Sequence, residues 1–342
     1  EGPQTFRRLA DRAFCEGMTR VVYHTASHNV PEAGLPGWTY TAGSHMNTNL
    51  TWWPLSDQLH AYLARTGAML MQGDFVADAA YYYGHQVPNF AKPKHYREGL
   101  GTGFDYDTIN TDVLLHSSVD TEGCIRLPGG MRYRVLVLPP DDTRMDLDVL
   151  EHIAGLLLRG AAVIGNKPTE TYGLADLPKQ PALRKLADAM WGVDDRSSEK
   201  SERRYGRGRV YMDWAERDVL ASLKVSPDFH VHAPELARKL DYIHRRSPHQ
   251  EIYFVRNASE ESINADVTFR VNGKHPELWD PADASMTPIA AYRETETGTR
   301  LPLSLPPLGS AMILFVQNVE PTDRIVSISR NGQTVFPAAG NQ

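Results

Sequence analysis

The front of the chain holds its densest group of side chains that could do chemistry. The group combines carboxyl, imidazole, amide and indole groups within the first 53 residues. Its members are Glu1, His24, His28, Glu32, Trp38, His45, Asn47, Asn49, Trp52 and Trp53. Flat aromatic rings cover the apolar C–H face of a sugar ring, while amides, imidazoles and carboxyl groups bind its hydroxyls. The residue types in this group therefore favour a carbohydrate site.

The two adjacent tryptophans have a second interpretation. Trp52 and Trp53 stand at the start of a predicted helix, and adjacent helical residues point in different directions. We therefore expect one of the two rings to belong to the hydrophobic core and the other to be able to face a ligand.

His24 and His28 raise the question of a metal. On a helix their spacing of four would place two imidazoles on one face as metal ligands. The pair falls instead at the end of a predicted strand and in a loop, and the motif H-E-x-x-H is absent. Hydrogen bonding to a polar ligand and ordinary packing within the loop are the favoured interpretations.

Glu1 and Glu32 are the candidate acid–base residues. If Val21–His24 is a barrel strand, its carboxyl end lies at the edge where a (β/α)₈ barrel carries its active site. Glu1 precedes the helix before this strand, so it would follow the preceding strand at the same edge. Glu1 is the first candidate and Glu32, in the loop after His24, is the alternative. The competing interpretation of Glu1 is a solvated carboxylate at a chain end.

Motifs of other enzyme classes are weak or missing. The run Gly101–Gly103 lacks the third glycine and the preceding strand of a dinucleotide fingerprint, so no nucleotide cofactor is expected. Neither a P-loop nor a G-x-S-x-G elbow is present. Asp105, Asp107 and Asp112 lack the spacing and the closing Glu of a calcium-binding EF-hand. The first two are expected to cap a helix through Ile109–Leu115, and this middle segment is predicted to be a scaffold without chemistry of its own.

The elements that position the front group follow an α/β rhythm over residues 1–73. Apolar or small residues recur at helical spacing over Thr5–Gly17 and over Leu55–Met71, which predicts two helices. Between them Thr19–His24 predicts a strand, and a long loop rich in Gly, Pro, Asn and His follows over Thr25–Thr51. Helix, strand, loop and helix in this order indicate the end of a (β/α)₈ barrel.

Residues 74–240 repeat the α/β rhythm more clearly. Leu147–Leu158 predicts an amphipathic helix between two buried strands, which makes a βαβ unit with parallel strands and a right-handed crossover. The predicted strands are Ala77–Gly84, Tyr133–Leu138, Gly160–Gly165 and Arg209–Met212. This pattern predicts a Rossmann- or flavodoxin-like α/β domain.

Residues 241–342 contain no convincing helix. Short strand-like runs alternate with turn signals such as Asn272-Gly273, a pattern that predicts an antiparallel β-sandwich. The runs are Glu251–Arg256, Ala265–Val271, Pro288–Arg293, Arg300–Leu305 and Ala311–Val316.

Composition excludes several classes of partner. The 342 residues include 36 Lys and Arg against 42 Asp and Glu, a formal net charge of −6 without a basic run, which argues against nucleic acid. No apolar stretch approaches the ~18 residues of a membrane span.

Cys15 and Cys124 are expected to be buried free thiols. Because Glu1 opens directly into a predicted helix, we expect a piece of a longer protein, periplasmic or extracellular if a signal peptide preceded it.

Longer stretches of the sequence carry a family resemblance. They are DRAFCEGMTRVVYHTASHNVPEAGLPGW, AGSHMNTNLTWWPLSDQLHAYLARTGAMLMQGDFVADAAYYYG, GFDYDTINTDVLL, LPGGMRYRVLVLP and GAAVIGNKPT. These stretches resemble the later part of bacterial α-L-rhamnosidase-type enzymes of glycoside hydrolase family 106. ELWDP followed by LPPLGSAMILFV is similar to the closing β-sandwich of that family. The resemblance runs in order through nearly the whole chain.

The resemblance implies a fold and an activity. Enzymes of this kind have a (β/α)₈ catalytic barrel, then an α/β domain, then β-sandwich modules, and they hydrolyse terminal α-L-rhamnosides with inversion, often with calcium in the active site. Mapped onto this chain, 1–73 would be the C-terminal part of the barrel, 74–240 a glutamine-amidotransferase-like α/β domain and 241–342 the sandwich. The implied partner is a rhamnose-containing glycan or glycoside.

The sequence departs from that family in one respect, because most of the barrel is missing. An inverting enzyme needs an acid and a base, two carboxyl groups about 6.5–9.5 Å apart. Glu1 is assigned the base by hypothesis, with Glu32 as the alternative and the second carboxylate expected upstream. The fragment alone is therefore expected to be inactive.

Two other functions stay open on the sequence. The α/β and sandwich segments could form a non-catalytic carbohydrate-binding or oligomerisation portion. A β-galactosidase-like retaining glycosidase is the other alternative, for which the two carboxyl groups would lie about 5–5.5 Å apart.

Overall fold

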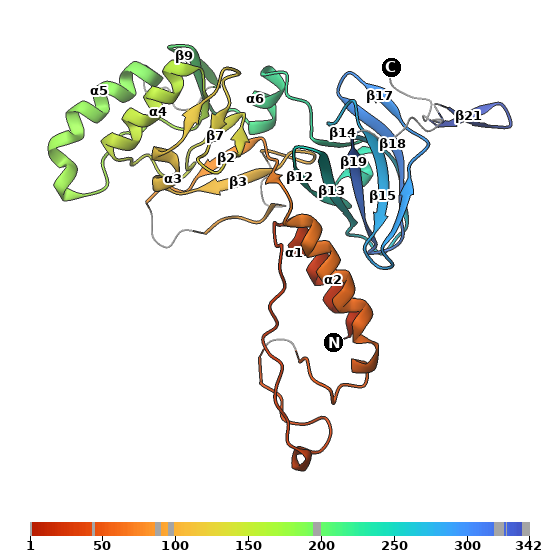
Figure 1. Cartoon of the computed structure of the whole chain (residues 1–342). Coiled ribbons are helices and arrows are strands. Elements are labelled where there is room, and N and C mark those ends of the chain that lie inside the picture. The colour runs from red at the N-terminus through yellow and green to blue at the C-terminus, as the bar shows by residue number, and fades with distance from the viewer. Residues whose placement is uncertain are drawn as a thin grey trace. The chain divides into compact units, whose positions relative to one another are not determined.

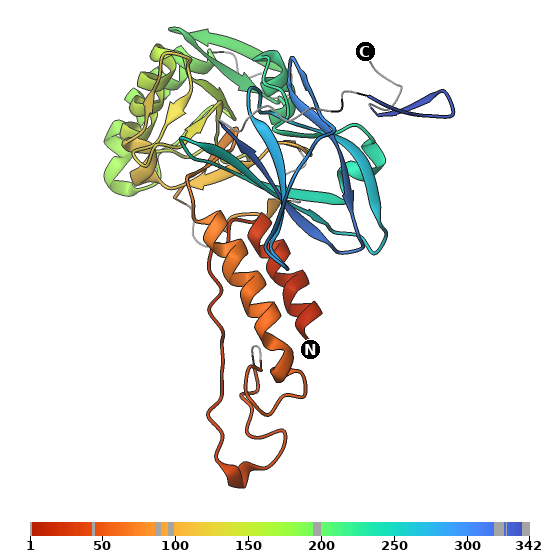
Figure 2. The same ribbon diagram turned by 45° about the vertical axis from the view of Figure 1, so that its right-hand side comes forward.

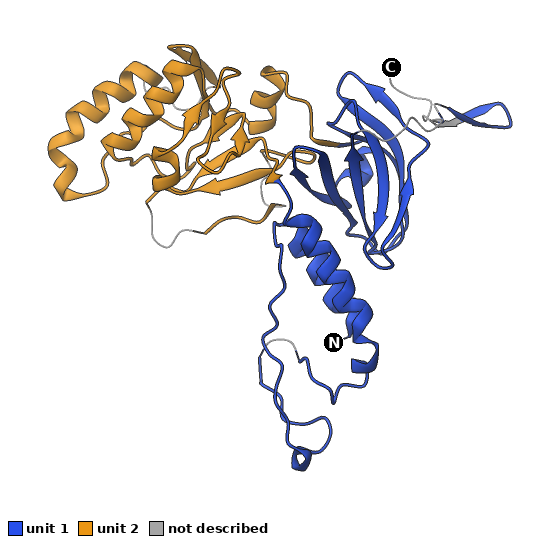
Figure 3. Cartoon of the chain, viewed as in Figure 1, with its two compact units in different colours: residues 1–73, 230–342 blue, residues 74–229 orange. Residues whose placement is uncertain are grey.

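The computed structural model describes residues 2–42, 45–85, 90–94, 99–193, 200–317, 325 and 327–336. The chain divides into two compact units (Figure 3): residues 74–229 form one, and residues 1–73 together with 230–342 form the other. Helices and strands alternate along the first unit, and antiparallel sheets dominate the second (Figure 1). In the described part of the chain, no helix combines the length and the apolar character that a membrane crossing needs.

Residues 74–229 are built on a mostly parallel sheet. Its strands lie in the order β3, β2, β7, β8, β10 and β9; the first five are parallel, and β9 runs antiparallel to β10. Their bounds are β2 Ala79–Tyr82, β3 Tyr106–Ile109, β7 Val135–Val137, β8 Ala162–Ile164, β9 Ser201–Tyr205 and β10 Gly208–Met212. The short strands β4 (Ser118–Val119), β5 (Ile125–Arg126) and β6 (Arg132–Tyr133) form a separate antiparallel sheet.

Helices cover both faces of this sheet because its strands are apolar on both sides. Alternate strand residues point to opposite faces, so Ala80 and Leu136 enter one core while Ala79 and Val135 enter the other. The first core also holds side chains of α4 (Leu147–Arg159). The bounds of the other helices of this unit are α3 Thr111–Leu115, α5 Gln180–Trp191 and α6 Glu216–Ser222, with a 3₁₀ segment at Leu174–Lys179. Helices α3, α4 and α5 contribute side chains to the first core, and α6 contributes to the second.

Most strand pairs of the other unit are antiparallel and belong to two larger sheets, while β20 and β21 form a separate two-stranded antiparallel sheet. One larger sheet pairs β12, β13, β19, β15 and β16 in that order, and the other pairs β11, β14, β18 and β17. Side chains of the two sheets meet in an aromatic core, where the ring of Tyr253 lies 4.7 Å from Phe269, and Phe269 lies 5.3 Å from Phe315. The bounds are β11 Phe229–Val231, β12 Leu240–Arg246, β13 Gln250–Asn257, β14 Ile263–Phe269, β15 His275–Asp280, β16 Ser285–Pro288, β17 Arg293–Thr295, β18 Gly298–Leu305, β19 Ser310–Val316, β20 Ile328–Arg330 and β21 Gln333–Phe336, with helix α7 at Pro234–Ala237.

Two helices of the front segment pack side by side and onto this unit's first sheet (Figure 2). They are α1, Pro3–Cys15, and α2, Ser56–Leu70. Phe14 of α1 meets Phe254 of β13 edge to face at 5.8 Å. The Tyr62 hydroxyl of α2 donates to buried Asp11 at 2.5 Å and lies 2.8 Å from the Ser310 hydroxyl. Segments distant in sequence are therefore tied together by both apolar and polar contacts.

The structure corrects three expectations about elements. Pro288–Arg293 is not a strand but the connection between β16, which ends at Pro288, and β17, which begins at Arg293. Thr19–His24 is not a strand: its backbone is extended, but no described residue pairs with it in a ladder. A strand needs a neighbour for its N–H and C=O groups, and this segment has none within the described part of the chain. Tyr106–Ile109 is strand β3 rather than a helix start, and Asn110 caps α3 by accepting from the Val113 N–H at 2.9 Å.

Candidate functional site

The front group of residues lies on the segment that joins α1 to α2. This segment runs as an extended stretch from residue 18, continues through the 3₁₀ turn Pro31–Ala33, and returns through a second 3₁₀ turn, Trp53–Leu55, into α2. Because α1 and α2 are fixed by buried contacts, they hold both ends of the segment in place. The long loop between the two ends carries most of the predicted site residues.

The end of the loop nearest the helices is an aromatic cluster. The Tyr23 hydroxyl lies 2.9 Å from Nδ1 of His60, and the two rings meet edge to face at 5.5 Å. His60 also meets the ring of Trp53 at 6.0 Å, and Trp52 contacts Phe6 of α1 at 5.8 Å. Both indoles are half-buried, Trp52 against α1 and Trp53 against α2. Burial raises the pKa of Tyr23, so its hydroxyl is a hydrogen-bonding group rather than an anion.

A second cluster in the loop is built from amide side chains around Gly37. The Asn29 side chain accepts from the Trp38 backbone N–H at 2.5 Å. A Cβ at Gly37 would lie 2.5 Å from Asn29 Oδ1 and 2.6 Å from Asn49 Nδ2, so both amides approach this glycine closely. Gly37 also has φ +86°, a conformation that favours glycine. Asn47 is buried, and its Oδ1 accepts from the Asn49 N–H at 2.9 Å.

The other predicted residues are mostly exposed. His24 meets Tyr40 edge to face at 5.4 Å, and His28 and Glu32 are exposed. The Trp38 side chain is 61% exposed, as a ring that receives a ligand from solvent would be. His45 is half-buried. Glu1 lies outside the described residues.

The structure therefore brings the predicted residues into two places rather than one. Trp52 and Trp53 belong to the aromatic cluster, while Trp38, Asn47 and Asn49 belong to the amide cluster. Glu32, on its own 3₁₀ turn, is the carboxyl group that the described part of the loop contributes. Of the other acids in the front segment, Asp11 is buried against Tyr62, and Glu16 and Asp57 stand at helix ends.

Four residues that the sequence interpretation missed belong to these clusters: Tyr23, Asn29, Tyr40 and His60. His60 follows Trp53 by seven residues, about two turns of the helix predicted over this stretch, so the spacing would have suggested that the two rings lie on one side of it. Tyr23 and Asn29 carry no such signal, because their roles depend on where the loop folds back.

The described residues do not gather the side chains of a calcium site. Among the described residues, no group of three His, Cys, Asp or Glu side chains gathers as metal ligands. Calcium is held by about six to eight oxygen ligands, and the front loop offers Glu32 alone among carboxylates in its described part.

The chain is similar to known glycosidases in sequence and in structure. A family model of glycoside hydrolases, number 106, described as alpha-L-rhamnosidase, matches residues 1–294. A solved structure of a rhamnosidase from Novosphingobium sp. PP1Y superposes with a TM-score of 0.83 at 28% sequence identity; the alignment covers 97% of this chain and 31% of that chain. Both similarities include the front segment.

A protein of Formosa agariphila named "Putative beta-glucuronidase" is 31% identical over 332 residues, which are 96% of this chain and 27% of that protein. A β-galactosidase from Bacillus circulans sp. alkalophilus is 11% identical with a TM-score of 0.47, and the alignment covers 76% of this chain and 44% of that one. The chain thus spans about a third of the length of the rhamnosidase, and about a quarter of the Formosa protein.

Proposed function

The chain belongs to glycoside hydrolase family 106, and from this membership we propose that it acts within a longer enzyme that hydrolyses terminal α-L-rhamnosides with inversion. The observation that carries the proposal is the alignment of 97% of the chain with a rhamnosidase at a TM-score of 0.83. The exposed indole of Trp38 and the amides around Gly37 support a sugar ligand, because they combine an aromatic face with hydrogen-bonding groups.

The proposed reaction uses two carboxyl groups on opposite sides of the sugar ring. A general acid protonates the oxygen of the leaving group, while a carboxylate takes a proton from the water that attacks the anomeric carbon. We assign the base to Glu1 and keep Glu32 as the alternative. The general acid is assigned to a part of the enzyme outside these 342 residues. A calcium ion stays a prediction from the family resemblance.

Residues 1–73 are proposed to form the closing part of a (β/α)₈ barrel. From Val21 to His28, half-buried and exposed residues alternate one by one, and Val22 is 85% exposed. This alternation is that of a β-strand, although no described residue pairs with it. Pairing with barrel strands from elsewhere in the longer enzyme would satisfy this backbone and cover Val22.

The finer fold of the remaining residues is proposed from their topology. The order β3, β2, β7, β8, β10 places the first strand of the sheet second, which is the flavodoxin-like order; a glutamine-amidotransferase-like α/β domain has the same layered plan. The facing antiparallel sheets of residues 230–317 are proposed to be the β-sandwich.

An activity assay tests the proposal. We expect the complete protein, of the length of its relatives, to release the aryl group from an aryl α-L-rhamnoside, and the 342-residue chain alone to release none. Aryl β-D-galactosides and β-D-glucuronides serve as control substrates. Preference for either control by the complete protein would contradict the rhamnosidase assignment, and turnover by the chain alone would contradict the need for the rest of a barrel.

A further inference from the structure

The parallel sheet of residues 74–229 has a topological switch point that the proposed reaction does not use. β2 is the first strand of the sheet in sequence, and it lies between β3 and β7. The connection from β2 to β3 contributes Leu100 and Phe104 to one core, whereas the connection from β7 to β8 runs through α4 in the other. The chain therefore leaves β2 and β7 toward opposite faces, and a crevice forms outside the carboxyl ends of these two strands.

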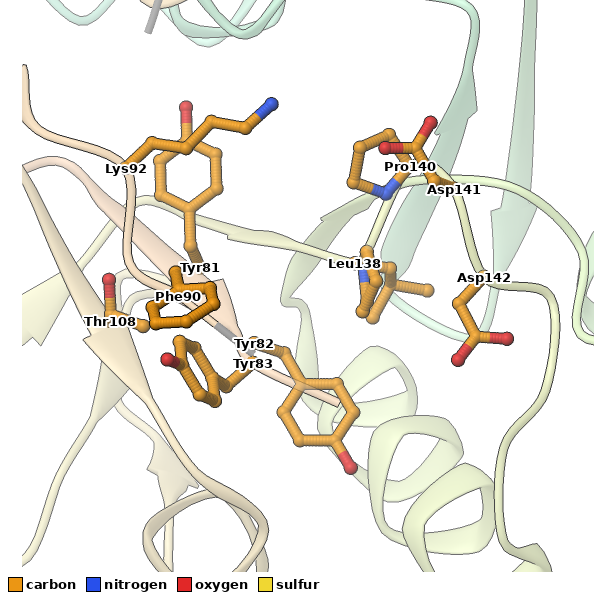
Figure 4. Close-up of a pocket in the computed structure, with 11 residues that line it drawn as sticks. Tyr81, Tyr82, Tyr83, Phe90, Lys92, Thr108, Leu138, Pro140, Asp141 and Asp142 are labelled. Atoms are coloured by element: carbon orange, nitrogen blue, oxygen red, sulfur yellow. The ribbon is translucent and has the colours of Figure 1, made fainter. Parts of the chain in front are cut away.

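A pocket lies in this crevice (Figure 4). Its volume is about 150 Å³, comparable to the ~150 Å³ cavity that holds one benzene. Residues on and after β2 and on β3 line one side, and residues after β7 line the other. The lining residues are Tyr81, Tyr82, Tyr83, Phe90, Lys92, Thr108, Leu138, Pro139, Pro140, Asp141 and Asp142.

Hydrogen bonds fix the polar wall of the pocket in place. The Asp142 side chain is 5% exposed, accepts from Arg144 Nε at 2.9 Å and accepts from the Tyr172 hydroxyl at 2.6 Å. Burial disfavours the carboxylate, but these two donors outweigh it and lower the pKa of Asp142. On the opposite side, Tyr82 is buried and its hydroxyl lies 3.0 Å from the Thr111 hydroxyl. The walls are thus held before any ligand binds.

The lining residues identify the class of ligand. Phe90 is 80% exposed at the pocket, and it offers a ring face to an apolar surface. Asp141 is exposed opposite it and can accept hydrogen bonds from hydroxyl groups. Asp142 is paired with Arg144, so among the described lining residues the exposed carboxylate of Asp141 stands against the cation of Lys92, and the lining carries no excess of positive charge for phosphate or another anion. A small ring with one apolar face and several hydroxyls matches this lining.

We propose that this pocket is a second carbohydrate site, which binds one neutral pyranose outside the carboxyl ends of β2 and β7. The pyranose can be a free monosaccharide or the end residue of a glycan. Because every lining residue lies within residues 74–229, binding here needs no catalytic barrel, and loss of catalysis would leave it intact.

Ligand-observed NMR on the 342-residue chain tests the proposal. The probes are L-rhamnose, D-galactose and D-glucose, their methyl glycosides, and D-glucuronate, titrated past the ~1 mM Kd of a weak complex. We expect at least one neutral pyranose to give saturable binding, and D-glucuronate to bind more weakly than D-glucose because its carboxylate would lie near the exposed carboxylate of Asp141. A methyl glycoside that binds as tightly as its free sugar indicates the end of a glycan; a preference for the free sugar indicates a monosaccharide.

Matched variants locate the signal. Phe90→Ala and Asp141→Ala are expected to weaken binding about tenfold, whereas Leu177→Ala and Glu151→Ala, exposed residues of the same unit outside the pocket, leave it unchanged. Thermal unfolding of each variant checks that it is folded. The proposal is overturned if no neutral pyranose saturates, if the pocket variants bind like the controls, or if Trp38→Ala alone removes the signal, which would place the sugar in the front loop.

Discussion

At the scale of single residues, the proposed base is the first point to test. Glu1→Gln keeps the size of the side chain and removes the group that would take a proton from water. Loss of a general base costs about 10²–10⁴-fold in rate, so we expect kcat of the complete enzyme on an aryl α-L-rhamnoside to fall by that factor. Glu32→Gln in the same protein separates the two candidates. If Glu32→Gln causes the large loss and Glu1→Gln does not, the roles are reversed.

A second residue-scale prediction concerns Glu251, which is buried on β13. His244 Nε2 lies 2.9 Å from this carboxylate, and Arg246 and Lys274 donate to it at 2.9 and 3.0 Å. Burial alone would raise the pKa of Glu251, but these partners outweigh it and lower the pKa to about 2 from the model-compound value of 4.5. The stabilisation is therefore fully present above pH 4.5 and is lost as the pH falls toward 2.

The corresponding measurement is chemical unfolding as a function of pH. A depression of this size corresponds to about 3 kcal/mol of stability. We expect Glu251→Gln to remove most of it near neutral pH and to flatten the pH dependence between 4.5 and 2. Glu260→Gln, an exposed acid in the loop that follows β13, is the control and should unfold like the unchanged chain. Parallel acid profiles for the two variants would show that the network contributes nothing.

At the scale of elements, α1 and α2 are held in position by the apolar side chains that they bury. Leu70 at the end of α2 is 0% exposed, whereas Leu55, just before the same helix, is 72% exposed. A Leu→Ala change in a core costs about 2–5 kcal/mol. Leu70→Ala should therefore lower the free energy of unfolding of its unit by that amount, and Leu55→Ala should change it by less than about 0.5 kcal/mol. Equal effects in denaturant titrations would mean that α2 is not anchored as described.

The elements also show how far sequence patterns reach. The apolar residues of Leu147–Leu158 recur at helical spacing and therefore predict a helix. The structure confirms it as α4, Leu147–Arg159. The buried strands β7, β8 and β19 were readable as continuous apolar runs. β12 was missed because its sequence, LDYIHRR, mixes charged with apolar residues and gives no apolar run that would mark a buried strand. The buried His244 on this strand is paired with Glu251, seven residues further along the chain on the neighbouring strand β13.

Less of the candidate site than of the fold could be predicted from the sequence. Residue types alone suggested a sugar-binding loop, but its two clusters depend on contacts between residues such as Asn29 and Trp38, and Tyr23 and His60. The pocket at β2 and β7 was overlooked for another reason. No motif marks it, because a switch point follows from strand order, and the order of β3, β2 and β7 is not visible along the sequence.

At the scale of the whole molecule, the chain belongs to glycoside hydrolase family 106 and spans about a third of the length of the Novosphingobium rhamnosidase and about a quarter of the Formosa protein. Its described residues supply a loop rich in aromatic and amide groups, together with Glu32 among the loop's carboxylates. Inverting hydrolysis requires a second carboxyl group about 6.5–9.5 Å from the first. We therefore propose that the catalytic site combines this loop with a part of the protein outside the 342 residues.

The stereochemistry of hydrolysis tests this proposal most directly. The complete enzyme is mixed with an aryl α-L-rhamnoside, and ¹H NMR follows the anomeric proton of the first product before mutarotation. Inversion predicts that β-L-rhamnose appears first and that the α-anomer grows in only later. Initial release of α-L-rhamnose would mean retention, with carboxyl groups about 5–5.5 Å apart, and would contradict the proposed mechanism; no release of rhamnose at all would contradict the proposed function.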